Sequence, residues 1–132
     1  MIRDNHLELG RKAENLAAEH VARLGWRILS RNFSCRLGEL DIVAMDEREK
    51  EKELVVVEVR YRTFGDMQSP ADSIGPKKLR TLVNAGRVYV DNIGWAGPWR
   101  VDLMGITANP QEPPAQWRLE HIENITDGIF RA

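Results

Sequence analysis

The sequence has a single cysteine and no long apolar run, and both shortages exclude whole classes of protein. Cys35 has no second cysteine with which to form an internal disulfide or a cysteine-based structural zinc site, which fits a reducing compartment. No apolar run approaches the roughly 20 residues that span a bilayer, and the N-terminus has no apolar signal core. We therefore expect a cytoplasmic protein with no membrane partner.

The sequence also lacks a strong net charge, because 19 Lys and Arg residues offset 20 Asp and Glu residues to give −1. Proteins that bind DNA strongly and without specificity are basic overall, so any affinity for nucleic acid must come from a local patch. Glycine-rich phosphate loops, nucleophile elbows and paired histidine spacings are absent as well. Competing sites for those chemistries are therefore weak.

The length of 132 residues, with 42% apolar and 30% charged residues, suits one domain with a real core, so residues 1–132 are expected to form a single domain. Apolar residues at helical spacing predict helices over residues 6–24 and from Pro76 to about residue 91. Alternating apolar residues predict five strands, at Trp26–Phe33, two within residues 38–62, Trp99–Ile106 and Gln116–Ile125. The order α-β-β-β-α-β-β is typical of an α/β fold with a mixed central sheet flanked by two helices and a crossover through the second helix.

The stretch from residue 38 to residue 62 contains two carboxylates in otherwise apolar strands. Apolar residues occupy alternate positions in both halves, and the charged turn between them should lie in water. Asp41 and Glu58 each lie in a run that otherwise looks buried. Charged side chains are seldom buried unless they are paired or bind a metal. Asp41 and Glu58 are therefore the first candidates for a functional site.

The expected register of this hairpin brings the two carboxylates together. In a simple antiparallel hairpin centred on the turn, Val43 lies opposite Val56 and Asp41 lies opposite Glu58. Opposite side chains share a face, with Cβ atoms roughly 4.5–5.5 Å apart, and two like charges that close repel unless a cation lies between them. Arg60 points to the same side as Glu58. The patch predicts an oxygen-ligand site for Mg²⁺ or Mn²⁺, although a slip of one residue would separate the carboxylates.

Glu14 is a further acidic candidate, on the first predicted helix. It lies one turn from Gly10 and one turn from Ala18, at the margin of the apolar stripe. It could therefore face the sheet. The alternative is a glutamate at the rim, paired with Arg11 or a lysine, and the spacing leaves both interpretations open.

The second predicted helix is the best candidate for contact with phosphate. From Ile74 to Val90 there are four basic residues and no acidic one. They are Lys77, Lys78, Arg80 and Arg87. An ordinary solvated helix face is the alternative. The preceding loop, from Thr63 to Pro76, is longer than most structureless connections, which suggests a lid or a substrate-contacting segment.

These pieces together resemble the YraN-like family of bacterial proteins, which is assigned to the PD-(D/E)xK, or restriction-endonuclease-like, fold. The sequence is also similar to the archaeal Holliday-junction resolvases. The similarity spans nearly the whole chain, through GRKAENLAAEHVARLGWRIL, RNFSCRLGELDIVAMD, LVVVEVRYR, GPKKLRTL, WRVDLMGI and HIENI. The segments GELDIVA and VEVRYR carry most of it.

The resemblance implies a catalytic role for four residues. Asp41 matches the motif's metal-binding aspartate and Glu58 its second acidic ligand, while Glu14 matches an acidic helix position that often completes such sites. Arg60 stands where the motif normally has a lysine, which orients or activates the attacking water. Arginine stabilises charge but stays protonated and cannot act as a base. Lys77 or Lys78 could substitute from the second helix.

The function implied is metal-dependent hydrolysis of phosphodiester bonds. No base-reading motif is present, so the expected partner is a nucleic acid recognised by its structure, most simply DNA with a junction, a flap or an end. The resemblance also allows a homodimer, since two active sites suit two strands. One alternative is a nucleic-acid-binding module that has lost efficient cleavage. Another is a structural or interaction protein in which Asp41 and Glu58 merely pair with Arg60, Arg62 or Arg100.

Overall fold

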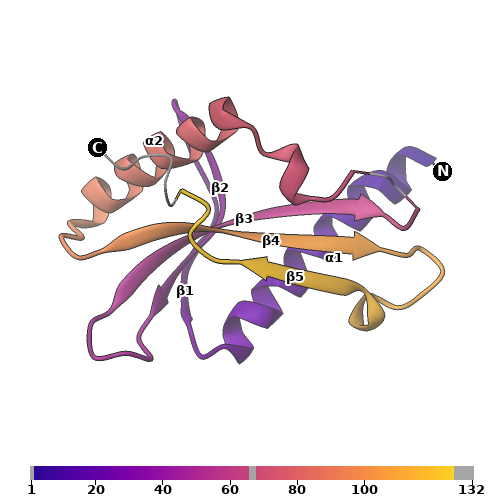
Figure 1. The fold of residues 1–132 in the computed structure, drawn as a ribbon, viewed down its shortest axis with the longest axis horizontal. Helices are drawn as coiled ribbons and strands as arrows, with labels where there is room; N and C mark the ends of the chain where they lie inside the picture. Colours follow the sequence, from indigo (N-terminus) through magenta and orange to yellow (C-terminus); the bar gives the residue numbers. More distant parts are fainter. Residues whose placement is uncertain (1, 66–67, 127–132) are drawn as a thin grey trace.

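Five strands form one sheet with a helix on each face (Figure 1). The computed structural model describes residues 2–65 and 68–126, and the side chains from Leu7 onward. In chain order the elements are α1 (Ile2–Arg23), β1 (Arg27–Cys35), β2 (Gly38–Asp46), β3 (Glu53–Thr63), α2 (Pro76–Ile93), β4 (Trp99–Ala108) and β5 (Arg118–Ile122), with short 3₁₀ turns at Ala71–Ser73 and Pro114–Gln116. Over these residues, neither helix combines the length and apolar character needed to cross a bilayer.

The topology confirms the predicted mixed sheet. The strands lie in the order β1-β2-β3-β4-β5, and every neighbouring pair is antiparallel except β3 and β4, which are parallel. A parallel pair needs a crossover connection, and α2 supplies it. The predicted order α-β-β-β-α-β-β is therefore correct. The last strand is shorter than predicted, because a 3₁₀ turn precedes it and Asn124 takes a left-handed backbone conformation just after it.

The predicted register of the central hairpin is also correct. Val43 pairs with Val56, and Ile42 pairs with Val57. The regular ladder between β2 and β3 ends at that second pair, one residue before Asp41. The two candidate carboxylates therefore lie where the strands begin to separate.

Each helix covers its own apolar cluster. Ala13, Ala17 and Val21 of α1 pack on one face of the sheet against Val55, Val57, Met104 and Ile106. Leu82, Ala85 and Tyr89 of α2 pack on the other face against Val43, Val56 and Val101. The apolar spacing of both helices follows from these contacts. Because neighbouring residues of β3 point to opposite faces, its side chains serve both clusters.

Strand β2 is irregular at Asp41. Residues two apart in a regular strand share a face. Leu40, however, packs with the α2 cluster, whereas Ile42 packs with the α1 cluster. In the adjoining strand, Asn32 lies between the partners of these two residues and has a φ of 56°. Strand β2 therefore changes face at Asp41, at the point where the ladder between β2 and β3 ends.

A second carboxylate, Asp102 of β4, is fully buried on the α1 face and is held by a network of donors. Arg100 Nε donates a hydrogen bond of 2.9 Å to Asp102 Oδ1, and Asn124 N–H donates one of 2.9 Å to the same oxygen. His121 Nε2 lies 2.8 Å from Asp102 Oδ2. The Arg100 guanidinium also lies 5.3 Å from the Trp26 ring centroid. This network closes the end of the α1 cluster.

Replacing Asp102 by Asn should lower the free energy of unfolding by about 3 kcal/mol at neutral pH, because it leaves Arg100 half-buried with a weaker partner. Burial alone would raise the pKa of Asp102, but hydrogen bonds from His121, Arg100 and Asn124 outweigh it and lower the pKa. A lowered pKa stabilises the fold above the unfolded pKa, near 4, and that stability is lost as the pH falls through the folded value. The gap between wild type and variant should therefore narrow below about pH 4.

Urea unfolding at a series of pH values measures this gap. Asp91→Asn, at an exposed position on α2, is the matched control and should have the same free energy of unfolding as the wild type. An Asp102→Asn protein as stable as the wild type at pH 7 would contradict a stabilising role for the network.

Candidate functional site

Asp41 is fixed at the point where β2 leaves β3. Its Oδ2 accepts a hydrogen bond of 2.8 Å from the backbone N–H of Val59. The Asp41 side chain thus takes the hydrogen bond of a β3 backbone N–H just beyond Ile42 and Val57, the last regular pair of the two strands. The carboxylate is held to the backbone of the residue that follows Glu58, and its position is set by the sheet rather than by a flexible loop.

Glu58 is the buried half of the pair, with 5% of its surface exposed. Its Oε2 lies 3.2 Å from Arg60 Nε and 3.6 Å from Lys78 Nζ. Arg60 follows two residues later on the same face of β3, and Lys78 comes from the first turn of α2. Burial, the negative charge of Asp41 and a hydrogen bond with the Asp41 carboxyl group raise the pKa of Glu58 to about 8, while Lys78 and Arg60 oppose that shift. At neutral pH the two carboxyl groups therefore hold a proton, as crowded acidic pairs do.

Arg60 has an unmet hydrogen-bonding requirement. Its Nε is buried and, although it is close to Glu58, it is the donor of no well-aligned hydrogen bond among the described residues. A buried donor without an acceptor costs about 1–3 kcal/mol. The Arg60 side chain is nevertheless 32% exposed, so the outer part of its guanidinium group, rather than Nε, can meet an anionic ligand.

Glu14 lines a separate hollow on the α1 side of the pair. The hollow has a volume of about 570 Å³ and is also lined by Arg11, Arg31 and Tyr61. Partial burial and the negative charge of Asp41 raise the pKa of Glu14, and the nearby Arg31 opposes the shift. Of the two interpretations left open by the sequence, the electrostatic influence of Asp41 favours a glutamate that faces the acidic pair.

The oxygen donors of the pair suit a hard divalent cation. Asp41 Oδ2 accepts the hydrogen bond from Val59, Glu58 Oε2 contacts Arg60 and Lys78, and the two carboxyl groups share a hydrogen bond, so a metal ion would take the place of the shared proton. Mg²⁺ is commonly held by one or two carboxylates together with water and substrate phosphate. Among the side chains that the structure describes, from Leu7 onward, no three His, Cys, Asp or Glu residues gather closely enough to hold a metal ion. Glu14 therefore does not join Asp41 and Glu58 in a preformed three-ligand set.

The structure divides the basic residues of α2 into two groups. Lys78 is half-buried and contacts Glu58, whereas the other three point to solvent. These three are Lys77, Arg80 and Arg87. The sequence could not distinguish Lys77 from Lys78 as a substitute for the missing motif lysine. The rotation of α2 on the sheet places Lys78 at the acidic pair.

The arginines proposed as purely structural partners differ from one another. Arg60 contacts Glu58, but Arg100 pairs with Asp102 and Glu53 instead. Arg62 donates hydrogen bonds to the Thr107 hydroxyl and to the Gln68 carbonyl oxygen.

Sequence reasoning missed Tyr61 and Arg31 as lining residues of the hollow. The alternation of VEVRYR was the available signal for Tyr61, since it puts this residue on the α1 face.

Fold and site together define a small α/β protein whose single mixed sheet holds an Asp–Glu pair beside two cationic side chains. The chain belongs to the uncharacterised protein family UPF0102, whose family model matches residues 13–106. This confirms the resemblance to the YraN-like family.

Relatives of similar length are found in distant bacteria. A UPF0102 protein of Nitrosococcus oceani is 39% identical over 114 residues, which cover 85% of this chain and 89% of the relative. One of Carboxydothermus hydrogenoformans is 35% identical over 124 residues, covering 93% and 98% of the two chains. One of Anaeromyxobacter dehalogenans is 38% identical over 129 residues, covering 97% and 90%.

Replacing Glu58 by Gln should stabilise the metal-free protein at high pH. A raised carboxyl pKa gives the fold a stability that is full below the unfolded pKa, near 4.5, and is lost as the pH rises through about 8. Gln removes that loss. We expect a gain in Tm on the order of 5 °C at pH 9 that disappears below pH 5, since 1 kcal/mol moves the Tm of such a domain by roughly 4 °C.

Thermal unfolding in a chelating buffer gives this comparison. Glu8→Gln is the control, because Glu8 is exposed and only loosely paired with Lys12, at 4.0 Å. A Tm difference between wild type and Glu58→Gln that stays constant from pH 5 to pH 9 would mean that Glu58 does not titrate as described.

Proposed function

We propose that this protein is a metal-dependent, nuclease-like protein that binds nucleic acid and hydrolyses phosphodiester bonds according to the structure of its substrate. The observation that carries the proposal is the meeting of the Asp41 and Glu58 carboxyl groups beside Lys78 and Arg60. An acidic pair attracts a divalent cation, and the neighbouring cations attract phosphate. The resemblance to the restriction-endonuclease-like fold points to the same chemistry, by analogy alone.

The metal would be Mg²⁺ or Mn²⁺, held by Asp41 and Glu58. When bound, it polarises a phosphoryl oxygen and makes water a better nucleophile at neutral pH. Glu58 must lose its proton to serve as a ligand, so affinity for the cation should rise with pH. Glu14, on the far side of the pair, would accept hydrogen bonds from water or substrate in the adjoining hollow.

Two cations share the work of the motif's single lysine in this proposal. Arg60 stays charged, so its role is to hold the phosphate and stabilise the negative charge that develops on it. The guanidinium group of Arg60, whose side chain is 32% exposed beside Glu58, fits this role. Lys78 has a compact ammonium group that can orient the attacking water and exchange a proton with it. It reaches Glu58 from α2 rather than from the strand.

Lys77, Arg80 and Arg87 would hold the nucleic-acid backbone on the outer face of α2. Contacts of this kind fix a strand in place but read no bases, which favours branched or end structures over a defined sequence. A homodimer would supply a second site for the other strand.

A second function deserves its own test, namely nucleic-acid binding without efficient cleavage. The contacts of Glu58 with Arg60 and Lys78 favour it, because both cations compete with a metal for the same carboxylate. In that case the acidic pair would be a structural feature of a binding surface.

Replacing Lys78 by Ala should slow metal-dependent cleavage on the order of a hundredfold, the typical effect of removing a proton-transfer group. Asp41→Asn should abolish it, because the pair loses a charged ligand. The measurement is single-turnover cleavage of a four-way junction, a flap and a linear duplex with Mg²⁺ or Mn²⁺. Lys77→Ala is the matched control. It removes the neighbouring positive charge, which points to solvent, and should leave the cleavage rate of the bound substrate unchanged. If the wild type binds these substrates and cleaves none of them, the nuclease proposal is wrong and the second function, nucleic-acid binding without efficient cleavage, is supported.

Removing Lys77, Arg80 or Arg87 singly should weaken duplex binding and make it less dependent on salt. Each lost phosphate contact lowers the slope of log K against log salt by about 0.9. Titrations at several salt concentrations measure this slope, with Lys12→Ala on α1 as the control. Slopes equal to that of the wild type would show that the outer face of α2 is only solvated.

A further inference from the structure

The hollow that Glu14 lines, on the α1 face of the sheet, has the composition of a site for a flat and partly apolar ligand. Its lining combines Tyr61 and Leu7 with the Asn32 amide and two arginines. Its volume of about 570 Å³ lies within the range of roughly 300–1,000 Å³ that is usual for sites of small organic ligands. Such sites combine apolar walls with a few polar groups that orient the ligand. The phosphate contacts proposed for α2 leave this hollow, on the opposite face of the sheet, without an assigned ligand.

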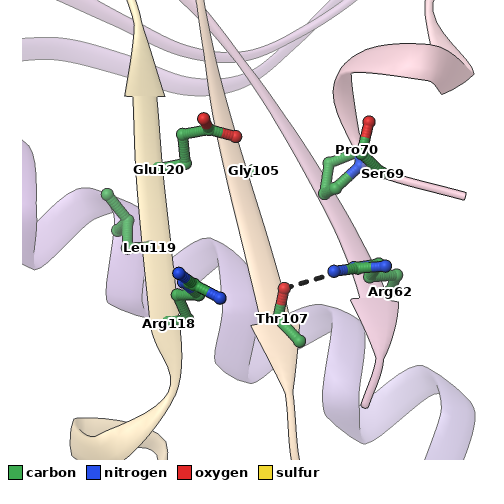
Figure 2. A pocket seen from close by; sticks show the side chains of 8 residues that line it. All are labelled: Arg62, Ser69, Pro70, Gly105, Thr107, Arg118, Leu119 and Glu120. Atoms are coloured by element: carbon green, nitrogen blue, oxygen red, sulfur yellow. Dashed lines mark hydrogen bonds between the residues drawn. The ribbon is translucent and has the colours of Figure 1, made fainter. Parts of the chain in front are cut away.

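A pocket on the α2 face, to which Val56 and Arg62 both point, differs in its chemistry. It has a volume of about 440 Å³ and lies between β3, β4, β5 and the segment before α2 (Figure 2). Arg62, Arg118 and Glu120 place charges of both signs around it, and its described lining residues include no aromatic ring. Arg62 also donates a hydrogen bond to the Thr107 hydroxyl there. A flat, partly apolar group beside the acidic pair therefore fits the hollow on the α1 face better.

The hollow begins beside Asp41. Asn32 of β1 falls opposite Asp41, between two regular pairs of β1 and β2. On the other side, the Val59 N–H binds the Asp41 carboxylate, and Tyr61 follows two residues later on the same face of β3. Two strand residues span about 7 Å. A ligand in the hollow is therefore an immediate neighbour of a group bound at the acidic pair.

Contacts between α1 and the sheet fix the walls of the hollow. A Cβ on Gly10 would lie 3.3 Å from Tyr61 Cε1, so the glycine lets α1 close against the ring. Arg31 Nη2 donates a hydrogen bond of 3.0 Å to Asn15 Oδ1, which ties β1 to α1. Asn32 has a φ of 56°, in the left-handed region that few residues other than glycine and asparagine adopt. The ring, and the backbone that carries the amide, are thus positioned by the fold itself.

We propose that this hollow binds an unpaired nucleobase, that of the nucleotide next to the phosphodiester held at the Asp41–Glu58 site, an inference that rests on the proposed function. Tyr61 and Leu7 offer apolar surface to the base, and the Asn32 amide offers a donor and an acceptor to its edge. A base within a duplex has its pairing edge taken and its faces stacked, so it cannot enter. The hollow then selects flaps, ends and junctions in which the strand is unpaired beside the cleaved bond.

Asn32→Gly tests this assignment. Glycine adopts a φ of 56° without strain, so the backbone is kept and only the amide is lost. Asn124→Gly is the matched control, because Asn124 is also exposed, has a φ of 52° and lies just after β5, outside the hollow. The probes are a labelled single strand of about 12 nucleotides and the same strand made of base-free residues, both titrated in a metal-free buffer.

The measured quantity is the preference for the strand with bases over the base-free strand. We expect the wild type and Asn124→Gly to bind the strand with bases about tenfold more tightly, since base contacts add to those of the phosphates. In Asn32→Gly this preference should fall about threefold, the effect of one lost hydrogen bond, with the affinity for the base-free strand unchanged. Circular dichroism checks that both variants fold.

A wild type that binds both strands equally would overturn the assignment of a base to this hollow. So would a preference that Asn32→Gly leaves intact, or an affinity that it lowers equally for both strands. In each of these cases the protein still binds nucleic acid, and the proposed function stands. If the wild type binds neither strand and no four-way junction, both proposals fail.

Adenosine monophosphate separates a strand from a free nucleotide as the source of the base. It should compete weakly with the labelled strand, because it lacks the further phosphates that contact α2. Adenosine monophosphate that displaces the strand at equal concentration, and does so less well in Asn32→Gly, would overturn the assignment to a strand in favour of a free nucleotide.

Discussion

The hydrogen bond from the Val59 backbone to the Asp41 carboxylate is the constraint on which the site depends. Strand partners normally satisfy each other through backbone groups. Here the side chain of Asp41 takes over as β2 separates from β3. That substitution holds a negative charge beside Glu58, which is itself buried, and the two carboxyl groups must share a proton, a metal ion or nearby cations to coexist.

Because the strands separate, side chains from both helices, which cover opposite faces of the sheet, lie near the same acidic pair. A continuous sheet would confine α1 and α2 to opposite surfaces. At Asp41 the strand changes face, so Leu40 packs with α2 and Ile42 packs with α1. The negative charge of Asp41 therefore helps to raise the pKa of Glu14 on α1, while Lys78 of α2 contacts Glu58. An acidic centre between two helices thus arises from a local irregularity in an otherwise regular hairpin.

Sequence reasoning predicted correctly those features that depend on a single strand or on the pairing of two neighbouring strands. The alternation of residues 38–62 and the position of the charged turn were enough to place Val43 opposite Val56. The choice between Lys77 and Lys78 depended on how α2 is rotated against the sheet, which the helical pattern does not specify closely enough.

Contacts across several strands were beyond that reasoning. Arg62 and Arg118 flank Thr107 only because β5 lies beside β4 in one register, and the two arginines are far apart in the chain. The contact of His121 with Asp102 depends on the same strand. Neither residue has a neighbour in sequence that reveals its partner. The change of face at Asp41 was hidden for a different reason: alternation predicts a regular strand, and a backbone irregularity appears only when both neighbouring strands are placed.

Arginine in place of the motif lysine therefore has a physical interpretation that the motif alone does not supply. A lysine at residue 60 would combine a charge that holds phosphate with a group that can exchange protons. In this structure the strand position carries a fixed charge whose buried Nε lacks a well-aligned acceptor, and a compact ammonium group reaches the same carboxylate from α2. Under the proposed function, binding of phosphate and handling of the proton are divided between Arg60 and Lys78. The arginine then does not by itself imply a lost activity, because the capacity that it lacks is present on the neighbouring helix.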